Sequence, residues 1–557
     1  MNGLVMLLIS AVVLLAAYLV YGRYLARKWG VDPKRPTPAH ELEDGVDYVP
    51  TRPSIVFGHE FASIAGAGPI NGPIQAAMFG WLPVLLWILI GGIFFGAVQD
   101  FSALYASVKN KGKTIGYIIE TYIGKTGKRL FLLFVWLFSI LVVAAFADIV
   151  AGTFAGFNAA GGKVEANAAV ATTSLLFIAA AIGLGFFMRK FKPTGIVSGI
   201  VAVVLLITCI TLGILCPIYV AKSIWLYVVF AYIFFASITP VWGLLQPRDY
   251  LNSFLLVAMI GAAFIGVVFT APVINIPAFT GFKVGNNYLF PILFVTVACG
   301  AVSGFHSLVA SGTASKQIDN EKHMLPISFG AMLVESLLAV LALITVGALT
   351  IGGKLPEGIV TPPQIFAFAV AGFLTKLGLP ANIVFTLITL SVSAFALTSL
   401  DSVARVGRLA FQELFTEELE PGQTAHPIAN FLANKYVATI ATLFVGYLLA
   451  VLGYQTIWPL FGSANQLLAA LSLIACSVFL KKTNRQGAML WGPMFIMLAV
   501  TFTALVFTII QKYDKIGAGS FTFGADGLQL VFAILLLGLG IMVAISGVKK
   551  LTERATA

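Results

Sequence analysis

Charged residues are scarce in this sequence of 557 residues. Only 10% are Asp, Glu, Lys or Arg, whereas 59% are hydrophobic. An ordinary soluble protein is about one-quarter charged, so this chain has too few charges to cover a water-facing surface of its size. The scarcity argues against a soluble enzyme. It requires an apolar solvent around the fold, as a lipid bilayer provides.

Cysteine is also rare, and its positions argue against a disulfide framework or a metal site. The four cysteines fall in or beside apolar runs, without the spacing of metal ligands. We therefore interpret them as small buried side chains. They are Cys209, Cys216, Cys299 and Cys476. The sequence predicts no metal and no organic cofactor.

The sequence does contain a series of long apolar runs separated by short polar segments. Runs of about 20 residues match the hydrocarbon core of a bilayer. The sequence therefore predicts an all-α polytopic membrane protein with about 15 transmembrane helices. The runs are residues 3–22, 57–79, 81–107, 130–154, 168–188, 194–216, 223–246, 251–272, 289–313, 325–351, 380–400, 428–452, 456–480, 487–511 and 527–547.

Four smaller features are predicted to be structural. Residues 363–378 are apolar but short, which favours a re-entrant or interfacial helix. Residues 401–416 are predicted to form a separate amphipathic cytoplasmic helix, and Asp401 is well placed to cap its start. Residues 458–466 are predicted to interrupt the thirteenth run and to serve scaffold packing.

The distribution of Lys and Arg predicts the orientation. With the N-terminus outside and the C-terminus cytoplasmic, most of the 34 Lys and Arg residues fall in cytoplasmic loops, as the positive-inside rule requires. The outer side holds Lys163, Lys222, Lys283, Lys354, Lys376, Lys512 and Lys515. This asymmetry also accounts for the formal net charge of +11, so nucleic acid is not predicted as a partner.

Two apolar runs contain residues that interrupt helices. Gly66, Gly68 and Pro69 lie at the midpoint of the second run, and Pro240 lies within the seventh. The backbone groups that such a break frees are tolerated in a membrane only where they line a cavity. A kinked packing helix is the alternative, because glycine also permits close helix contacts. The solute-binding residues predicted at these breaks are Ser63, Gly66, Ala67, Gly68, Ser237, Thr239 and Trp242.

The two interrupted runs are five spans apart and run in opposite directions across the membrane. This arrangement predicts a five-plus-five inverted repeat, a LeuT-like core, with extra helices around it. The first repeat is expected over residues 57–216 and the second over 217–400. Residues 1–56 would form the first transmembrane helix and a cytoplasmic loop. Residues 401–557 would form the amphipathic helix and C-terminal scaffold helices.

The ninth and tenth runs contain candidates for ion coupling. Ser303, Ser307 and Ser311 follow helical spacing and form a polar stripe, and hydroxyl oxygens suit a hard cation such as sodium. His306 lies beside the stripe and could contact the solute or transfer a proton. A neutral core histidine is the equally open alternative. Glu335 is central in the tenth run and is a second candidate proton site, unless it pairs with a buried donor.

Ionisable residues near the predicted cytoplasmic edge suggest an inner gate. His59 and Glu60 open the second run, Asp100 lies in the third, and Arg248 with Asp249 ends the seventh. Charges in hydrocarbon cost at least a few kcal/mol each, so such residues are seldom accidental. A structural cluster and a tight turn are the alternatives. No fixed spacing supports a metal site.

Several blocks of this sequence resemble the carbon starvation protein A family of bacterial inner-membrane transporters. The matching blocks run from about residue 54 to 480 and include polar residues within apolar runs. They are Phe57-Gly58-His59 through Gly72-Pro73, Gln99-Asp100-Phe101, Gln246-Pro247-Arg248-Asp249-Tyr250-Leu251-Asn252, Ser303-Gly304-Phe305-His306-Ser307, Ser311-Gly312-Thr313-Ala314-Ser315-Lys316-Gln317, Ala331-Met332-Leu333-Val334-Glu335-Ser336, Thr398-Ser399-Leu400-Asp401 and Phe461-Gly462-Ser463-Ala464-Asn465-Gln466. The resemblance implies a place in the amino acid–polyamine–organocation superfamily. It also implies uptake of peptides or pyruvate during carbon starvation, with proton-coupled symport in the case of pyruvate.

The sequence and the resemblance together predict a secondary active transporter that works by alternating access. A small carboxylate-bearing solute, such as pyruvate or a short peptide, would bind between the breaks of the second and seventh runs. A proton or a sodium ion would couple the cycle. The alternatives are a channel, a membrane-embedded enzyme and a membrane nutrient sensor. A channel would permit no uphill accumulation, and no spacing typical of an enzyme site is present.

Overall fold

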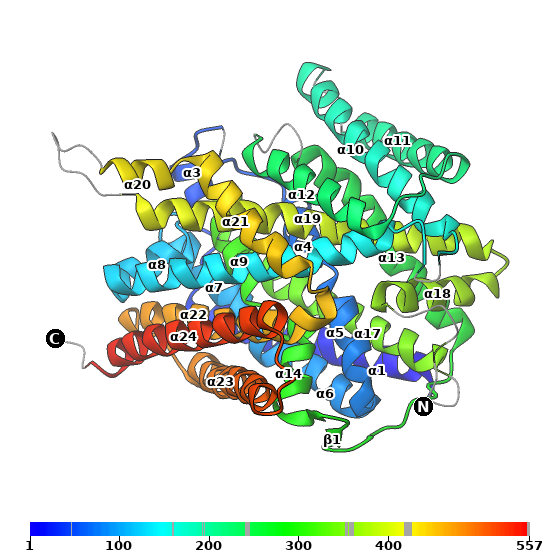
Figure 1. Ribbon diagram of the computed structural model, residues 1–557. Coiled ribbons are helices and arrows are strands. Elements are labelled where there is room, and N and C mark those ends of the chain that lie inside the picture. The colour runs from blue at the N-terminus through cyan, green and yellow to red at the C-terminus, as the bar shows by residue number, and fades with distance from the viewer. Residues whose placement is uncertain are drawn as a thin grey trace. The chain divides into compact units, whose positions relative to one another are not determined.

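The computed structural model consists almost entirely of helices, which confirms the all-α class (Figure 1). It describes the chain except for residues 46, 159–160, 192, 194, 240–244, 351–354, 356–360, 417–425 and 554–557. In the described part the only strands are β1 (Lys283–Val284) and β2 (Asn287–Tyr288), which form a short antiparallel hairpin.

The chain forms two compact units, and neither is continuous in sequence. The first unit combines Met1–Val5, Val142–Ile276 and Ile344–Tyr454. The second combines Met6–Leu141, Pro277–Leu343 and Gln455–Ala557. Each unit therefore contains residues of both predicted repeats, 57–216 and 217–400. The limits of the two repeats stay a prediction.

The first unit is built from long apolar helices and a few shorter ones. α10 and α11 lie side by side as a pair (Figure 1), and α19 packs against α10, α12, α13, α18 and α21. The helices are α10 (Glu165–Phe191), α11 (Gly195–Leu215), α12 (Lys222–Ile238), α13 (Leu245–Thr270), α18 (Pro362–Thr375), α19 (Ala381–Phe415), α20 (Pro427–Leu432) and α21 (Lys435–Ala450).

The second unit contains the helices that are broken within an apolar run. Its helices are α2 (Arg23–Trp29), α3 (Pro38–Glu41), α4 (Pro53–Ile64), α5 (Gly68–Ala76), α6 (Trp81–Gly91), α7 (Ala97–Lys109), α8 (Ile115–Tyr122), α14 (Leu289–Thr296), α15 (Ala298–Ala301), α16 (Gly304–Gly312), α22 (Tyr454–Lys482), α23 (Ala488–Gly517) and α24 (Leu528–Thr552). Three helices pass from one unit into the other along the chain: α1 (Gly3–Ala17), α9 (Lys125–Phe154) and α17 (Ala331–Leu349).

Eleven helices in the described residues are long and apolar enough to cross a membrane. Each coincides with one of the apolar runs in the sequence. The other four runs correspond to the broken pair α4–α5, the broken series α14–α16, and the shorter apolar helices α12 and α21. The chain is thus a multi-pass membrane protein, while the count of about 15 crossings stays a prediction.

The predicted separate helix at 401–416 is wrong, because α19 continues without a break from Ala381 to Phe415. This segment contains no proline and one glycine, so nothing in it stops a helix. Asp401 is therefore in mid-helix and does not cap a helix start. The predicted interruption at 458–466 is also wrong. The apolar core of α22 is completely buried, and this packing holds it helical across Pro459.

The predicted break in the second run is confirmed. α4 ends at Ile64, α5 begins at Gly68, and Ala65 between them has a non-helical backbone. In the seventh run α12 ends at Ile238, and α13 begins at Leu245. The predicted break residues there, Pro240 to Gly243, lie outside the described residues.

The ninth run is also broken, which the sequence did not lead us to expect. α15 ends at Ala301 and α16 begins at Gly304, with Val302 and Ser303 extended between them. The predicted single polar stripe is therefore wrong in one respect: Ser307 and Ser311 lie on α16, whereas Ser303 lies in the break.

Candidate functional site

The first break lies within the second unit and is stabilised by a tight turn. The Gly66 N–H donates to the carbonyl of Ile64 (2.8 Å), and α5 then starts at Gly68 with Pro69 in its first turn. Helix N-termini present N–H groups and a partial positive charge. Asn71 on α5 is completely buried, and both atoms of its side-chain amide lack hydrogen-bond partners within the described chain. The break thus combines a helix start with an unsatisfied buried amide.

The second break is stabilised by hydrogen bonds from one asparagine of another helix. Asn465 of α22 accepts a hydrogen bond from the Phe305 N–H (3.2 Å) through its Oδ1. Its Nδ2 donates to Ser303 Oγ (3.1 Å) and to Cys299 Sγ (3.4 Å). These bonds replace the intrahelical ones that the break removes. Asn465 therefore stabilises the extended backbone at Val302 and Ser303.

The two broken helices contact each other at their breaks. Gly68, which starts α5, packs directly against Cys299 of α15, and Gly72 packs against the backbone of Thr296. A Cβ added at Gly68 would lie 2.5 Å from the Cβ of Cys299. The contact therefore requires glycine, for space rather than for backbone conformation.

Replacing Gly68 by alanine is expected to destabilise the second unit by about 1–3 kcal/mol, because it overpacks this contact. The loss should be largely reversed by adding Cys299→Gly, which removes both clashing atoms. Thermal unfolding in detergent measures the effect. Gly58→Ala on α4 is the matched control, because nothing lies within 4 Å of its Cβ position. Equal stability of the Gly68 and Gly58 variants would contradict the packing.

Next to the second break, one histidine lies between two carboxylates. His306 on α16 has its Nδ1 2.8 Å from Asp100 Oδ2 on α7 and its Nε2 3.3 Å from Glu335 Oε2 on α17. Glu60 on α4 interacts electrostatically with Asp100 and His306. All four residues are at most 1% exposed. We call Glu60, Asp100, His306 and Glu335 the ionisable cluster.

The ionisable cluster cannot be fully charged. With all three carboxylates ionised, even a protonated imidazole would leave two uncompensated negative charges in a buried site. Buried charges without partners are very costly, and no hydrogen bond satisfies either Glu335 oxygen or Glu60 Oε2 within the described residues. The cluster must therefore bind protons, or another cation, to remain buried.

Gln99 links the ionisable cluster to the second break. With its amide nitrogen turned toward its acceptors, Gln99 donates to the Ser303 carbonyl (2.8 Å) and to Asp100 Oδ1 (3.1 Å). The backbone N–H of His306 also donates to the Ser303 carbonyl (3.3 Å). A change in charge at Asp100 or His306 therefore acts directly on the backbone of the break.

The three serine hydroxyls predicted to bind an ion are engaged within the protein. Ser303 bonds to Asn465, Ser307 donates to the Gly304 carbonyl and pairs with Ser472 (2.7 Å each), and Ser311 donates to the Ser307 carbonyl (2.6 Å). Ser303 and Ser307 face α22, where Gly304 leaves no room for a Cβ beside the α22 backbone. The Ser311 hydroxyl instead accepts from the Ile115 N–H of α8 (3.2 Å). The role of the three hydroxyls as a sodium site stays a prediction.

The predicted gate residues fall into two separate groups. Glu60 and Asp100 belong to the ionisable cluster of the second unit, where the half-buried His59 lies next to Glu60 on α4. Arg248 and Asp249 belong to the first unit. Their role in gating stays a prediction.

The Arg248 group is a buried ion-pair network within the first unit. The Arg248 guanidinium bonds to Asp401 of α19 and to the Tyr232 hydroxyl of α12, and it lies 3.4 Å from Asp249. The Tyr232 hydroxyl also donates to Asp401 (2.8 Å). Arg248 is 1% exposed and Asp401 0%. Asp401 is thus the partner of a buried arginine, not the predicted helix cap.

Two residues that were predicted to bind solute at the seventh run have backbone carbonyls that accept hydrogen bonds from arginines of α19. The Ser237 carbonyl accepts from Arg408 (2.6 Å), and the Thr239 carbonyl accepts from Arg405 (2.7 Å). Arginines at a helix C-terminus satisfy its free carbonyls. Trp242 lies outside the described residues. A solute-binding role for Ser237, Thr239 and Trp242 stays a prediction.

Asn71, Gln99, Tyr232 and Asn465 were not predicted as site residues. For the three amides a signal was present in the sequence, because amides within apolar runs are rare and need partners or ligands. Across the described ranges, no group of three or more His, Cys, Asp or Glu residues is arranged to hold a metal ion.

The fold and the site define a multi-pass membrane protein with two broken helices in contact and a buried ionisable cluster beside them. The family model described as "Carbon starvation protein CstA" matches residues 2–355 and 357–504. The chain therefore belongs to the carbon starvation protein CstA family.

Curated relatives in this family are named as transporters. The "Peptide transporter CstA" of Bacillus subtilis is 33% identical over 99% of this chain and 97% of its own. The "Pyruvate/proton symporter BtsT" of Escherichia coli is 32% identical over 86% of this chain and 77% of its own.

Among solved structures, a manganese transporter from Eremococcus coleocola aligns with a TM-score of 0.43 at 12% identity, covering 91% of this chain and 99% of its own. A Na⁺-coupled sialic acid symporter aligns with a TM-score of 0.39 at 14% identity, covering 96% and 97%. Both similarities are remote.

Proposed function

We propose that this protein is a proton-coupled secondary transporter that imports a small carboxylate-bearing nutrient by alternating access. Pyruvate and short peptides are the leading solutes, because curated relatives are named for them. The observation that carries the proposal is the imidazole of His306 between Asp100 and Glu335, buried and joined to a helix break. The proposed location is the bacterial plasma membrane, with the N-terminus outside and the C-terminus cytoplasmic.

The proposed coupling ion is a proton. An unperturbed imidazole titrates near physiological pH, and the carboxylates of the ionisable cluster need protons to stay buried. The serine hydroxyls that could bind sodium already have partners inside the protein. Protonation of the cluster would therefore precede its burial in each cycle, and release of the proton inside would complete the cycle.

The proposed solute site is at the first break. In the first turn of α5, Pro69 has no N–H and the Asn71 N–H donates to the Ala67 carbonyl (2.9 Å), so the N–H groups of Gly68 and Ile70 would bind the carboxylate. The unsatisfied side-chain amide of Asn71 adds a buried hydrogen-bonding group on the same helix. Ser63, Gly66 and Ala67 would line the same site. For the first unit, a solute-binding role for Ser237, Thr239 and Trp242 and a gating role for Arg248 with Asp249 remain proposals.

We also infer an inverted repeat and a place in the amino acid–polyamine–organocation superfamily. The second broken helix favours a different starting point for the second repeat from the one first predicted. The runs 57–79 and 289–313 are both broken, and the predicted orientation gives them opposite directions. Each is followed by a long helix with a π-helical turn, at Gly92–Gly96 and at Leu325–Gly330. The repeats would then start at residues 57 and 289.

Uptake into proteoliposomes tests the proposed function. Acidifying the outside by one pH unit should support about tenfold accumulation of pyruvate at one proton per monoanion, and a sodium gradient should add nothing. Counterflow with a panel of short carboxylates, amino acids and di- to tripeptides would identify the solute. Accumulation that follows sodium and ignores pH would overturn the proton proposal. Equilibration without accumulation under any gradient would favour a channel.

A further inference from the structure

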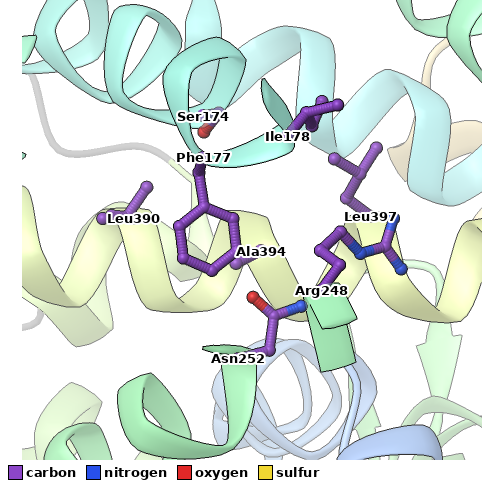
Figure 2. A pocket seen from close by; sticks show the side chains of 8 residues that line it. All are labelled: Ser174, Phe177, Ile178, Arg248, Asn252, Leu390, Ala394 and Leu397. Carbon is purple, nitrogen blue, oxygen red and sulfur yellow. The ribbon is translucent and has the colours of Figure 1, made fainter. Parts of the chain in front are cut away.

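A small cavity lies within the first unit, between α10, α13 and α19. Figure 2 shows the Phe177 ring between Ser174 and the side chains of Arg248 and Asn252. The walls are mostly apolar, and the cavity has room for about one water molecule. It is therefore too small to be a second solute site.

In the second unit, a loop and a linker are bonded to each other beside the helices of the ionisable cluster. The loop, which we call the strap, comprises residues 32–44 and 47–51 between α2 and α4. The linker comprises residues 313–324, between α16 and the π-helical turn that precedes α17. Both lie on the side that the charge distribution predicts to be cytoplasmic.

A series of polar contacts joins the strap to the linker. The backbone N–H groups of Val49 and Thr51 donate to the carbonyls of Lys316 (3.3 Å) and Gln317 (3.1 Å). Water can replace such bonds with little net loss of free energy, so the two segments can separate. The other contacts are Thr37 Oγ1 with the Ile318 carbonyl, Asn320 Nδ2 with the Pro33 carbonyl (2.9 Å), His40 Nε2 with the Asp319 carbonyl (3.1 Å) and Lys316 Nζ with Asp47 (3.3 Å).

One buried ion pair connects the linker to α7. Lys109, the last residue of α7, bonds to Glu321 Oε1, and the Asp32 N–H of the strap donates to Glu321 Oε2 (2.8 Å). The Glu321 side chain is 1% exposed and that of Lys109 is 10% exposed. A buried ion pair adds little net stability, because burial removes the hydration of both ions, and its best-attested use is in a switch.

These contacts lie at the ends of the helices that contain the ionisable cluster. α4 begins next to the strap, α7 ends at Lys109, and α16 ends at the linker. At 1.5 Å per residue, Glu60, Asp100 and His306 lie within about 14 Å of those helix ends. Because the residues of the cluster are at most 1% exposed, water reaches them from this side only if the helix ends separate.

The half-helix α16 has a fixed start and an end that the linker holds. Near its start, Asn465 bonds to the Phe305 N–H (3.2 Å), and Gly304 packs against the α22 backbone. The extended residues Val302 and Ser303 separate it from α15. A few non-helical residues at the end of an element are what a hinge requires.

We propose that the strap and the linker form the inner gate of the transport cycle, with the Lys109–Glu321 pair as its lock and the second break as its hinge. Opening separates the helix ends and lets water reach the ionisable cluster from the cytoplasm. Closing returns the cluster to its buried state. This inference rests on the proposed function, because the gate acts only within a transport cycle.

A reversible disulfide across the gate tests the proposal. Thr51 and Ile318 form a parallel bridge pair, so their Cα atoms lie about 5 Å apart, which a disulfide can span. The variant Thr51→Cys/Ile318→Cys also carries Cys216→Ser, which removes an exposed native thiol. Oxidation should reduce solute counterflow at least tenfold, and reduction should restore it. Each single-cysteine variant should be insensitive to the oxidant.

The disulfide experiment separates failure of the gate from failure of the proposed function. A fully cross-linked protein that exchanges solute at the rate of its reduced form overturns the inner gate and leaves the proposed function intact. An unaltered protein without counterflow of any carboxylate or peptide contradicts the proposed function, and the gate with it.

Glu321→Gln tests the lock separately, because it leaves the backbone contacts of the strap in place. Without this charge the gate should open more often, so fewer molecules face outward. The KM for external solute should rise about threefold at an unchanged maximal exchange rate. Glu120→Gln is the matched control, because it alters an ion pair between α8 and α9, and it should change neither quantity. A Glu321 variant with a lower Tm and an unchanged KM has lost only a structural contact, which overturns the lock.

Discussion

Replacing Glu335 by glutamine is expected to reduce uphill solute uptake at least tenfold while leaving solute exchange intact. Glutamine keeps the shape of the side chain but cannot bind or release a proton, so the imidazole of His306 loses one of its two carboxylate partners. Proton-driven accumulation and counterflow, measured in the same proteoliposomes, separate the two effects. The variant should exchange solute across the membrane without concentrating it.

Glu120→Gln is the matched control for this prediction. Glu120 on α8 pairs with Lys128 (2.7 Å), and both are about one-fifth exposed, so this change removes a carboxylate outside the ionisable cluster. It should accumulate solute as the unaltered protein does. Normal pH-driven accumulation by the Glu335 variant at every pH would remove Glu335 from the coupling mechanism.

Breaking the buried Arg248–Asp401 pair should produce the largest loss of stability. Arg248→Leu leaves Asp401 buried with the Tyr232 hydroxyl as its remaining partner. Removing one partner of a buried ion pair costs about 3–5 kcal/mol. Chemical unfolding in detergent should show this loss, and Asp401→Leu should show a similar one.

The double variant Arg248→Leu/Asp401→Leu should recover much of that loss, because it leaves no buried charge alone. Lys550→Ala is the matched control. Its pair with Glu553 is exposed at 40% and 46%, and such pairs contribute at most about 1 kcal/mol. A double variant no more stable than either single variant would show that the pair itself, and not the orphaned charge, determines the stability.

The sequence predicted the first break because its cause is local. Gly66, Gly68 and Pro69 disfavour a helix wherever they occur together. The second break was missed because its cause is distant. Val302 and Ser303 contain no helix breaker, and their extended backbone is stabilised by Asn465, far along the chain. No pattern within the ninth run could have predicted that contact.

The ionisable residues were identified from the sequence, but their grouping was not. Glu60 and Asp100 were assigned to a gate, and His306 and Glu335 to a solute and ion site, because polar residues in apolar runs can be found without knowing which helices meet. Asp401 was interpreted as a helix cap, since its partner Arg248 lies on another helix. Helix packing alone decides such pairings, and a single sequence does not encode it in any local pattern.

Proton entry upon solute addition tests the proposed mechanism most directly. A pH-sensitive dye sealed inside proteoliposomes reports protons that arrive with the solute when no gradient is imposed. Adding pyruvate, or the peptide found by counterflow, should acidify the interior with the unaltered protein and leave the dye unchanged with Glu335→Gln. Undiminished acidification in the Glu335→Gln liposomes would show that the proton crosses by another route and would contradict the role of the cluster.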